Sequence, residues 1–398
     1  MGLFKEVKKP VIKSATAGNG DISPLRPRYV EKTPPCRAHC LHGNDVRGVL
    51  VTIAQAQAYG RTTAQALELA WRRITERNPF PAICGRVCQH PCEPACNRKQ
   101  KDGAVSIHLL ERFLGDYAIA HGFKLEKPKQ SFDQPIAVIG SGPAGLSCAY
   151  HLARRGYSVT VFEAAPKPGG MMRYGVPRSM IPGEVLDGEI ANLVSAGVEL
   201  RCDCAVGRDA ALDEVRRKYA AVFFAMGLQK PSQLMLKRDG EGIVVAGELH
   251  AEPPGGAYAE PDQFDARVGN TISPAIAQGR KVAEEIDALL RGCQPESKTA
   301  PPVIRSEQMK LGWYPAASPH ADIPPAVQLG ITEAEATEEA KRCLSCGLCM
   351  DCETCWMYCS VNCFAKLPKG EHYRIKLELC NGCKKCAEAC PCGYIELN

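Results

Sequence analysis

The chain has 398 residues and a formal net charge of +5, and its composition is ordinary for a soluble protein except for 22 cysteines. This length allows two to four domains with a sizeable core. The longest apolar run, AAVFFAMGL, is too short to span a membrane. The first residues, MGLFKEVKKPVIKS, contain no apolar signal-peptide core. We therefore expect a cytoplasmic protein that does not associate with a membrane.

The cysteines lie mainly in two groups. Six fall between Cys36 and Cys96, and twelve fall between Cys343 and Cys392. Many are separated by two residues, a spacing typical of metal sites in a reducing compartment. We therefore favour metal ligation over a secreted disulfide framework.

The first part of the chain predicts an extended arm followed by a small helical domain. Residues 1–35 carry lysines and prolines without an apolar period, and such an arm could dock on a partner. Apolar residues then recur at helical spacing in DVRGVLVTIAQAQAYG, TTAQALELAWRRITER and AVSIHLLERFLGDYAIAHG. A cysteine-rich loop separates the second and third of these segments. We assign the helical domain to residues 36–130.

Residues 131–292 alternate between strand and helix patterns. IAVIG reads as a buried strand, GPAGLSCAYHLARRGY as a helix and SVTVFEA as a second strand. The turn between the first strand and the helix carries Gly140, Gly142 and Gly145, which allow the backbone to approach a pyrophosphate at a helix N-terminus. Glu163 ends the second strand, where an acid binds ribose hydroxyls. This pattern predicts a dinucleotide site, without distinguishing FAD from NAD.

The remaining chain is predicted to be a linker and a cysteine-rich tail. Residues 293–340 are rich in proline and end in a short helix, TEAEATEEAKRC. Residues 341–398 resemble a bacterial-type ferredoxin with two [4Fe–4S] clusters, because two runs of four cysteines follow each other. The resemblance implies crossed ligation, in which each cluster takes three cysteines from one run and one from the other. One set would be Cys349, Cys352, Cys355 and Cys390, and the other Cys380, Cys383, Cys386 and Cys359.

Two features of the tail leave alternatives open. Structural zinc is the competing interpretation, but zinc sites use a pair of Cys-x2-Cys units rather than two runs of four. Ser360 stands where the first run of a ferredoxin usually continues with proline. Four surplus cysteines would be buried thiols near the clusters, alternative ligands or a third site: Cys343, Cys346, Cys363 and Cys392.

From about residue 36 to residue 290 the chain resembles the small subunit of glutamate synthase and its relatives, including the amino-terminal half of dihydropyrimidine dehydrogenase. The matching stretches are NPFPAICGRVCQHPCEPAC, AVSIHLLERF, VIGSGPAGLSCAYHLARRGYSVTVFEA, PGGMMRYGVPRSMIP and GNTISPAIAQGRKVAEEID. The resemblance implies FAD in the first dinucleotide fold, and a helix N-terminus near the flavin at TISPAIAQG. The implied cofactor residues are Gly140, Gly142, Pro143, Ala144, Gly145, Glu163, Gly170, Met171, Arg173, Gly175, Val206, Ala225, Gly227, Gly247, Glu248, Thr271, Ile272 and Ala275.

The relatives carry two iron–sulfur clusters in the helical domain, beginning with a Cys-x2-Cys unit that this chain lacks before Cys36. We therefore expect one of the two clusters to be lost, and the loss of both stays open. The candidate ligands for the remaining cluster are Cys36, Cys40, Cys88, Cys92 and Cys96. Cys84 is the expected non-ligand. Glu111 is a weaker candidate, because some relatives use an amide or carboxylate ligand on the matching helix. His42, His90 and His108 are expected to be hydrogen-bonding or surface residues.

A second departure from the family concerns the nicotinamide. The relatives insert an NAD(P)H-binding domain where this chain has only 19 residues, Leu228 to Ala246. In addition, Gly247 and Glu248 stand where relatives usually have Gly-Asp. The predicted fold class is therefore α/β, with a helical iron–sulfur domain, a Rossmann-like FAD domain without the inserted domain and a ferredoxin-like α+β tail. A degenerate fold without flavin is the alternative.

These parts predict an electron-transfer subunit with FAD and three [4Fe–4S] clusters. No acid–base or nucleophile constellation is apparent, so the chemistry is expected in partner subunits. The tail resembles the two-cluster subunit of 2-oxoacid:acceptor oxidoreductases of the pyruvate, indolepyruvate or phenylglyoxylate type. That resemblance implies thiamine-diphosphate-containing catalytic subunits and a further electron-transfer or NAD-binding subunit, in an anaerobe. The cofactors are anionic, so we do not read the charge of +5 as a nucleic-acid signal. An NAD(P)H-oxidising flavoprotein and an iron–sulfur interaction scaffold are the alternatives.

Overall fold

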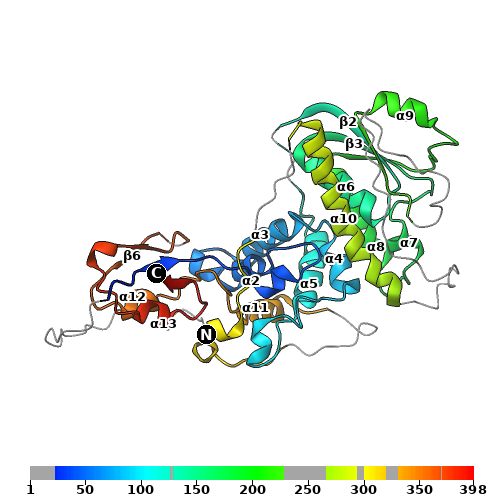
Figure 1. Ribbon diagram of the computed structural model, residues 1–398. Helices are drawn as coiled ribbons and strands as arrows, with labels where there is room; N and C mark the ends of the chain where they lie inside the picture. Colours follow the sequence, from blue (N-terminus) through cyan, green and yellow to red (C-terminus); the bar gives the residue numbers. More distant parts are fainter. Residues whose placement is uncertain are drawn as a thin grey trace.

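The computed structural model describes residues 23–125, 128, 130–227, 266–293, 300–319, 330–368 and 370–398. Figure 1 shows an α/β part at the upper right, a helical part at the centre and the cysteine-rich tail at the left. Within these ranges, no helix is long and apolar enough to cross a membrane.

The helical part is built from short helices that begin at recognisable caps. Its elements are α1 (Pro35–Ala38), α2 (Val46–Ala54), α3 (Thr63–Thr75), α4 (Pro81–Val87) and α5 (Ile107–Ala120), with the 3-10 helices η1 (Gln57–Tyr59) and η2 (Asn97–Gln100). Asp45 accepts a hydrogen bond from the Gly48 N–H at the start of α2, and Thr62 caps α3 reciprocally with Gln65. These caps satisfy N–H groups that have no partner within the helix.

One helix from the second half of the chain completes the helical core. It is α11 (Glu333–Lys341), which packs against α2 and α5. Its Ala336 and Ala340 are fully buried in the same cluster as Leu67 and Trp71 of α3. The segment expected to be a linker, 293–340, thus contributes a helix to the domain that precedes it.

The α/β part contains one four-stranded parallel sheet in the order β4-β3-β2-β5. The strands are β2 (Phe132–Ile139), β3 (Tyr157–Phe162), β4 (Val198–Arg201) and β5 (Ala221–Phe224). The helices are α6 (Pro143–Arg155), α7 (Met171–Tyr174), α8 (Gly183–Ser195), α9 (Leu212–Lys218) and α10 (Ala266–Leu290). Alternate residues of β2 face the two sides: Val138 packs with α6 and α10, and Ile139 packs with α9. This strand order is the one expected for half of a dinucleotide-binding fold.

Helix α10 starts earlier than its sequence pattern predicts. We expected a helix from Ser273 to Leu290, whose N-terminus in TISPAIAQG the family resemblance places near the flavin. In the structure it begins at Ala266 and Pro274 lies inside it. The predicted helix N-terminus near the flavin is therefore wrong. The helical pattern from Ser273 onward does not reveal that the preceding residues join the same helix.

The tail is a compact unit that also holds the described end of the arm. It contains α12 (Thr354–Tyr358), α13 (Lys385–Ala389), the hairpin of β6 (Phe364–Lys366) and β7 (Tyr373–Ile375), and the 3-10 helix η7 (Leu377–Leu379). Before it lie η4 (Ser306–Gln308) and η5 (Leu311–Trp313). From the arm, β1 (Pro27–Tyr29) pairs antiparallel with β8 (Ile395–Leu397). The described part of the arm therefore docks on the tail of its own chain.

Candidate cofactor sites

The turn after β2 has the geometry of a phosphate-binding loop. Gly140 has φ +105°, and its N–H donates to the Phe162 carbonyl at 2.8 Å. A Cβ at Gly140 would lie 2.4 Å from the Ala225 carbonyl oxygen, so only glycine fits without a shift. Gly142 is the N-cap of α6, and Pro143 occupies its first turn. This arrangement places a helix N-terminus and free backbone amides where a pyrophosphate would bind.

Glu163 lies beside this loop. Its carboxylate accepts hydrogen bonds from the Ser141 N–H at 2.9 Å and from the Ser141 hydroxyl, and a further one from the Ala165 N–H at 2.8 Å. The acid at the end of β3 is thus fixed against the turn after β2. This is the position from which an acid reaches the ribose of a bound dinucleotide.

The loop after β3 passes directly over the phosphate loop. Gly170 has φ +50°, and a Cβ there would lie 2.7 Å from the Gly142 Cα. Arg173 donates from Nε to the Pro168 carbonyl at 2.6 Å and forms an ion pair with Asp187. The guanidinium is therefore held by its own chain. Of the other residues expected in this loop, Met171 begins α7 and Gly175 is its C-cap.

The remaining predicted dinucleotide residues are spread around the sheet. Ala144 and Gly145 lie in the first turn of α6, and Ala225 and Gly227 follow β5. Val206 packs with the cluster that covers the α9 side of the sheet. On α10, Ile272 is buried and Ala275 is half-buried, and nothing is described of the Thr271 side chain. Gly247 and Glu248 lie outside the described residues.

The N-terminal cysteines divide between two cavities. Cys40, Cys88 and Cys92 line the first cavity together with Glu111. Glu111 is buried and accepts a hydrogen bond from the Asn78 side-chain amide at 2.8 Å. Three thiols and one carboxylate on a cavity wall are a donor set that suits an iron–sulfur cluster. Glu111, the weaker candidate in the sequence, is thus placed beside three of the five expected cysteines.

Cys36 and Cys96 face a second cavity. Their companions on its wall are Cys343 and Cys346, from the region just before the tail. Cys84 lines neither cavity: its sulfur is within 3.6 Å of the His42 Nε2 and contacts the Asn78 side-chain oxygen at 3.5 Å. The five candidate ligands assigned to one cluster from the sequence are therefore divided between two cavities, three on the first and two on the second.

The histidines of this region are engaged in hydrogen bonds or buried. His108 Nδ1 lies 2.8 Å from the Glu93 carboxylate, and His90 Nε2 lies 3.3 Å from the Cys84 carbonyl. Burial lowers the pKa of His42 and of His90 to about 4. Both rings are therefore neutral near pH 7.

The tail brings its eight expected cysteines together in the crossed pattern. Cys352, Cys349 and Cys390 all lie within electrostatic reach of Cys355 and raise its pKa, which burial has already raised strongly. Burial also raises the pKa of Cys386 to about 11, with Cys383, Cys380 and Cys359 contributing as neighbours. Of the surplus cysteines, Cys363 lies 3.0 Å from Cys359 and Cys392 lies 3.7 Å from Cys390, measured between sulfurs.

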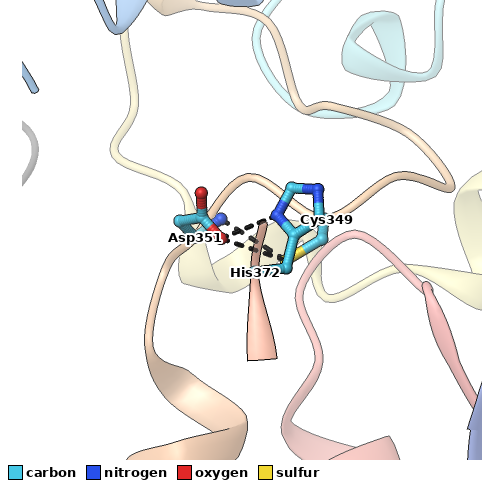
Figure 2. Close-up of side chains that lie close together, drawn as sticks. All are labelled: Cys349, Asp351 and His372. Atoms are coloured by element: carbon cyan, nitrogen blue, oxygen red, sulfur yellow. Dashed lines mark hydrogen bonds and ion pairs between the residues drawn. The ribbon is translucent and has the colours of Figure 1, made fainter. Parts of the chain in front are cut away.

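An acid and a histidine flank the first cysteine of the tail. Figure 2 shows Asp351 and His372 turned toward each other beside the Cys349 sulfur. His372 Nδ1 lies 2.7 Å from Asp351 Oδ1, which is 3.7 Å from the Cys349 sulfur, and the Tyr59 hydroxyl donates to the other Asp351 oxygen at 3.0 Å. Because Cys349 is an expected cluster ligand, we read its two neighbours as groups that orient it. No motif in the sequence points to His372, since the contact depends on the β6–β7 hairpin.

The first cysteine cavity adjoins the α/β part. Cys88 is the C-cap of α4, and α4 packs with α6, α8 and α10 in one apolar cluster. Glu189 of α8 accepts hydrogen bonds from the backbone N–H groups of Ala82 at 2.6 Å and Ile83 at 3.2 Å, at the start of α4. Tyr150 of α6 donates to the Thr75 carbonyl at 2.7 Å. The helix that carries Cys88 is thus fixed to the dinucleotide fold.

Comparison with known protein families identifies both the helical part and the α/β part. Residues 29–123 match the family model described as dihydropyrimidine dehydrogenase domain II, 4Fe-4S cluster. Residues 138–198 match the model of an NAD(P)-binding Rossmann-like domain. The chain therefore combines an iron–sulfur domain with a Rossmann-like dinucleotide-binding domain.

Its relatives are components of oxidoreductases. The chain is 34% identical over 219 residues to NADPH-Fe(3+) oxidoreductase subunit beta of Geobacter sulfurreducens, covering 54% of this chain and 31% of that protein. It is 31% identical over 248 residues to a homologue of NAD-dependent dihydropyrimidine dehydrogenase subunit PreT from Salmonella typhi, covering 61% and 56%. It is 36% identical over 176 residues to the glutamate synthase [NADPH] small chain of Bacillus subtilis, covering 44% and 36%.

The matched region spans between about a third and about a half of the length of these relatives. The similarity to glutamate synthase small chains and to dihydropyrimidine dehydrogenase is thereby confirmed. The names of the relatives do not bear on the ferredoxin-like tail.

Proposed function

We propose that this chain is an electron-transfer flavo-iron–sulfur subunit of a multi-subunit oxidoreductase. The observation that carries the proposal is the contact between the dinucleotide fold and the cysteine cavity next to it. Helix α4 bears Cys88 at its end and is buried against α6, α8 and α10 of the dinucleotide fold. A redox cofactor at Gly140–Glu163 would thus share one packed body with the metal site.

FAD is the dinucleotide that we assign to the phosphate loop. Bound there, it would exchange electrons in pairs as well as singly, whereas iron–sulfur clusters pass single electrons. The residues of this chain supply the helix N-terminus after Gly142, the acid Glu163 and the covering loop at Gly170. The fit rests on the close approach of Gly140 and Gly170 to neighbouring backbone, which leaves no room for a side chain.

The metal groups that we assign are iron–sulfur clusters. Cys40, Cys88, Cys92 and Glu111 would hold one in the helical part. The two crossed sets of the tail would hold two more: Cys349, Cys352, Cys355 and Cys390, and Cys380, Cys383, Cys386 and Cys359. Burial and mutual proximity raise the pKa of most of these thiols, so metal binding would have to displace their protons.

The partners that we propose are the catalytic subunits of a 2-oxoacid:acceptor oxidoreductase. This part of the proposal is supported by the resemblance of the tail to the two-cluster subunit of those enzymes. Electrons from 2-oxoacid oxidation by a thiamine-diphosphate-containing subunit would enter through the tail and reach the flavin. A further electron-transfer or NAD-binding subunit would receive them. The relatives named as subunits beta of oxidoreductases support an assembly of this general kind.

An NAD(P)H-oxidising flavoprotein is the second candidate. Its supporting observation is the match of residues 138–198 to an NAD(P)-binding model, together with the NADPH in the names of two relatives. The 19-residue segment Leu228–Ala246 speaks for the relay, because it is too short to form a second dinucleotide domain.

Flavin and iron analysis of the anaerobically purified chain tests the relay proposal against an interaction scaffold. We expect about one flavin per chain, released by heat and identified as FAD, together with acid-labile sulfide and several irons. A folded protein that contains iron but binds no flavin after incubation with FAD would favour the scaffold and contradict the proposal.

A further inference from the structure

The second cysteine cavity joins the two ends of the chain. Cys36 lies in α1, Cys96 caps η2, and the other two cysteines lie in the turn that follows α11. All four line one cavity, with Pro34, Arg47 and apolar side chains around them. After burial, the neighbouring thiols of Cys346, Cys343 and Cys96 are the strongest influences that raise the pKa of Cys36. Four thiols thus converge from segments far apart in the sequence.

The turn at Cys343 has the same local conformation as the turns of the tail. In the unit Cys343-Leu-Ser-Cys346, Ser345 has φ +48° and its N–H lies 3.5 Å from the Cys343 sulfur. Asp351 has φ +56° with an N–H 3.5 Å from the Cys349 sulfur. Gly382 has φ +75° with an N–H 3.4 Å from the Cys380 sulfur. A positive φ is costly for serine, so this shared turn points to a shared role.

The spacing of the four sulfurs argues against a single metal ion. A tetrahedral zinc site has Zn–S bonds of about 2.3 Å, which brings its sulfurs to within roughly 4 Å of one another. Among the described residues, the only group of three or more potential ligand atoms that all lie within 4.8 Å is Cys349, Asp351 and His372. The sulfurs around the second cavity are therefore too far apart for one ion and leave room for a larger metal group.

A buried cation faces this cavity without a full set of partners. Arg47 is 2% exposed and lines the cavity wall. Its Nη1 donates to the carbonyls of Lys32 at 3.0 Å and Cys346 at 2.8 Å, and its Nη2 forms an ion pair of 3.3 Å with the Glu31 carboxylate. Its Nε has no hydrogen-bond partner within the part of the chain that the structure describes. An unpaired buried N–H is costly, and a negatively charged group in the cavity would offset that cost.

We propose that Cys36, Cys96, Cys343 and Cys346 hold a further [4Fe–4S] cluster. The sequence predicts that one N-terminal cluster is lost, because the Cys-x2-Cys unit before Cys36 is missing. The structure places another Cys-x2-Cys unit, from the far end of the chain, beside the two cysteines that remain. The chain would then carry four clusters, and the fourth would bridge the helical part and the tail.

This site lies between the other cysteine groups. Cys92, a wall residue of the first cavity, is within electrostatic reach of Cys36. On the other side, Tyr314 is in reach of both Cys346 and Cys352 of the tail. The following route rests on the proposed function. Electrons would leave the iron held in the tail one at a time and enter the iron at the bridging site. They would then pass to the first cavity and the flavin, with each transfer oxidising one site and reducing the next by one electron.

Iron, sulfide and zinc analysis of the full chain, purified without oxygen, tests this site. We expect about sixteen irons and sixteen sulfides per chain, because each cluster contains four of each. Cys343→Ala with Cys346→Ala should lower both by about four, with flavin retained. The matched control, Cys204→Ala with Cys293→Ala, also removes two cysteines, from outside all four groups, and should lose no iron. Circular dichroism checks that each variant is folded.

Cys36→Ala provides a second approach from the opposite end of the chain. It should cause the same loss of about four irons and should weaken the low-temperature EPR signal of the reduced protein by about a quarter. If the double variant does not fold, Cys36→Ala alone tests whether the bridging cluster is present. A wild-type chain with flavin and about twelve irons, or with about one zinc in addition, would overturn the bridging cluster alone. A wild-type chain with neither flavin nor iron would instead contradict the proposed function.

Discussion

Cys36 and Cys346 come from opposite ends of the chain and line the same cavity. Buried polar contacts nearby hold together the two chain segments that carry these cysteines. Arg98 forms two hydrogen bonds of 2.7 Å with Asp102 and donates to the Arg342 carbonyl at 2.6 Å. Because Arg342 directly precedes Cys343, these contacts fix the turn that carries the last two cysteines. The helical part and the start of the tail are therefore one structural unit.

Replacing Asp102 tests how firmly this junction is held. Hydrogen bonds from Arg98 lower the pKa of Asp102 to about 2. A carboxyl whose pKa is depressed by folding stabilises the protein above its ordinary pKa, and this stabilisation is lost as the pH falls through the depressed value. Asp102→Asn should therefore lower the thermal midpoint at pH 7. The difference from wild type should shrink as the pH falls from about 4 toward 2, followed by tryptophan fluorescence.

The control for this experiment is Asp209→Asn. Arg208 also lowers the pKa of Asp209 to about 2, but that pair is exposed to solvent, where ion pairs contribute little. An equal loss of stability in the two variants would show that the Asp102 contacts do not hold the junction.

Glu163→Ala should weaken dinucleotide binding. The carboxylate is fixed beside the phosphate loop by Ser141 and Ala165, and on the proposed function its loss would remove a charged hydrogen-bond partner of the ribose. Such bonds contribute about 1.5–3 kcal/mol, which corresponds to a roughly tenfold to hundredfold rise in Kd for FAD. Fluorescence titration of the flavin-free protein with FAD measures this Kd. Glu214→Ala, on the exposed side of α9, should leave Kd unchanged, and an equal Kd for Glu163→Ala and wild type would argue against a ribose contact.

Gly140→Ala should disrupt the conformation of the phosphate loop and prevent flavin binding. Both Gly140 and Gly197 have φ near +105°, so alanine at either position suffers the same backbone cost of about 1–2 kcal/mol. Only at Gly140 would the new Cβ meet the Ala225 carbonyl oxygen, whereas nothing lies within 4 Å at Gly197. The Gly140 variant should therefore be purified without flavin, and Gly197→Ala should retain it. Flavin retained equally in both variants would contradict the close approach as the reason for glycine.

Glu111 offers a test of the first cysteine cavity. If its carboxylate is the fourth ligand beside Cys40, Cys88 and Cys92, Glu111→Ala should lower the iron content by up to about four per chain. Glu111→Gln keeps one ligand oxygen and should retain most of that iron. Iron and sulfide analysis distinguishes the two variants. Equal iron in Glu111→Ala, Glu111→Gln and wild type would exclude Glu111 as a ligand.

The dinucleotide loop could be predicted because its signal is local. The positions of Gly140, Gly142 and Glu163 follow from one strand–turn–helix–strand pattern, and the structure places them around one turn. The beginning of α10 was mispredicted because the helical pattern from Ser273 onward does not show what precedes it. Local signals give the kind of element more reliably than its ends.

The division of the cysteines could not be predicted, because it depends on tertiary contacts. Spacing within a run identifies Cys343 and Cys346 as a pair but does not say which other pair they meet. That meeting depends on the packing of α11 against α2 and α5. The sequence predicts this helix but places it in a linker, without indicating the helices that it contacts. The contact of Asp351 with His372 likewise depends on a hairpin whose pairing the sequence does not specify.

The most direct test of the relay is rapid mixing of the anaerobic, flavin-loaded chain with NADH and, separately, with NADPH. We expect that flavin absorbance does not bleach on the timescale of turnover with either nucleotide, while a one-electron reductant of low potential reduces both clusters and flavin. Rapid flavin bleaching by NADH or NADPH would contradict the relay and identify the chain as an NAD(P)H-oxidising flavoprotein.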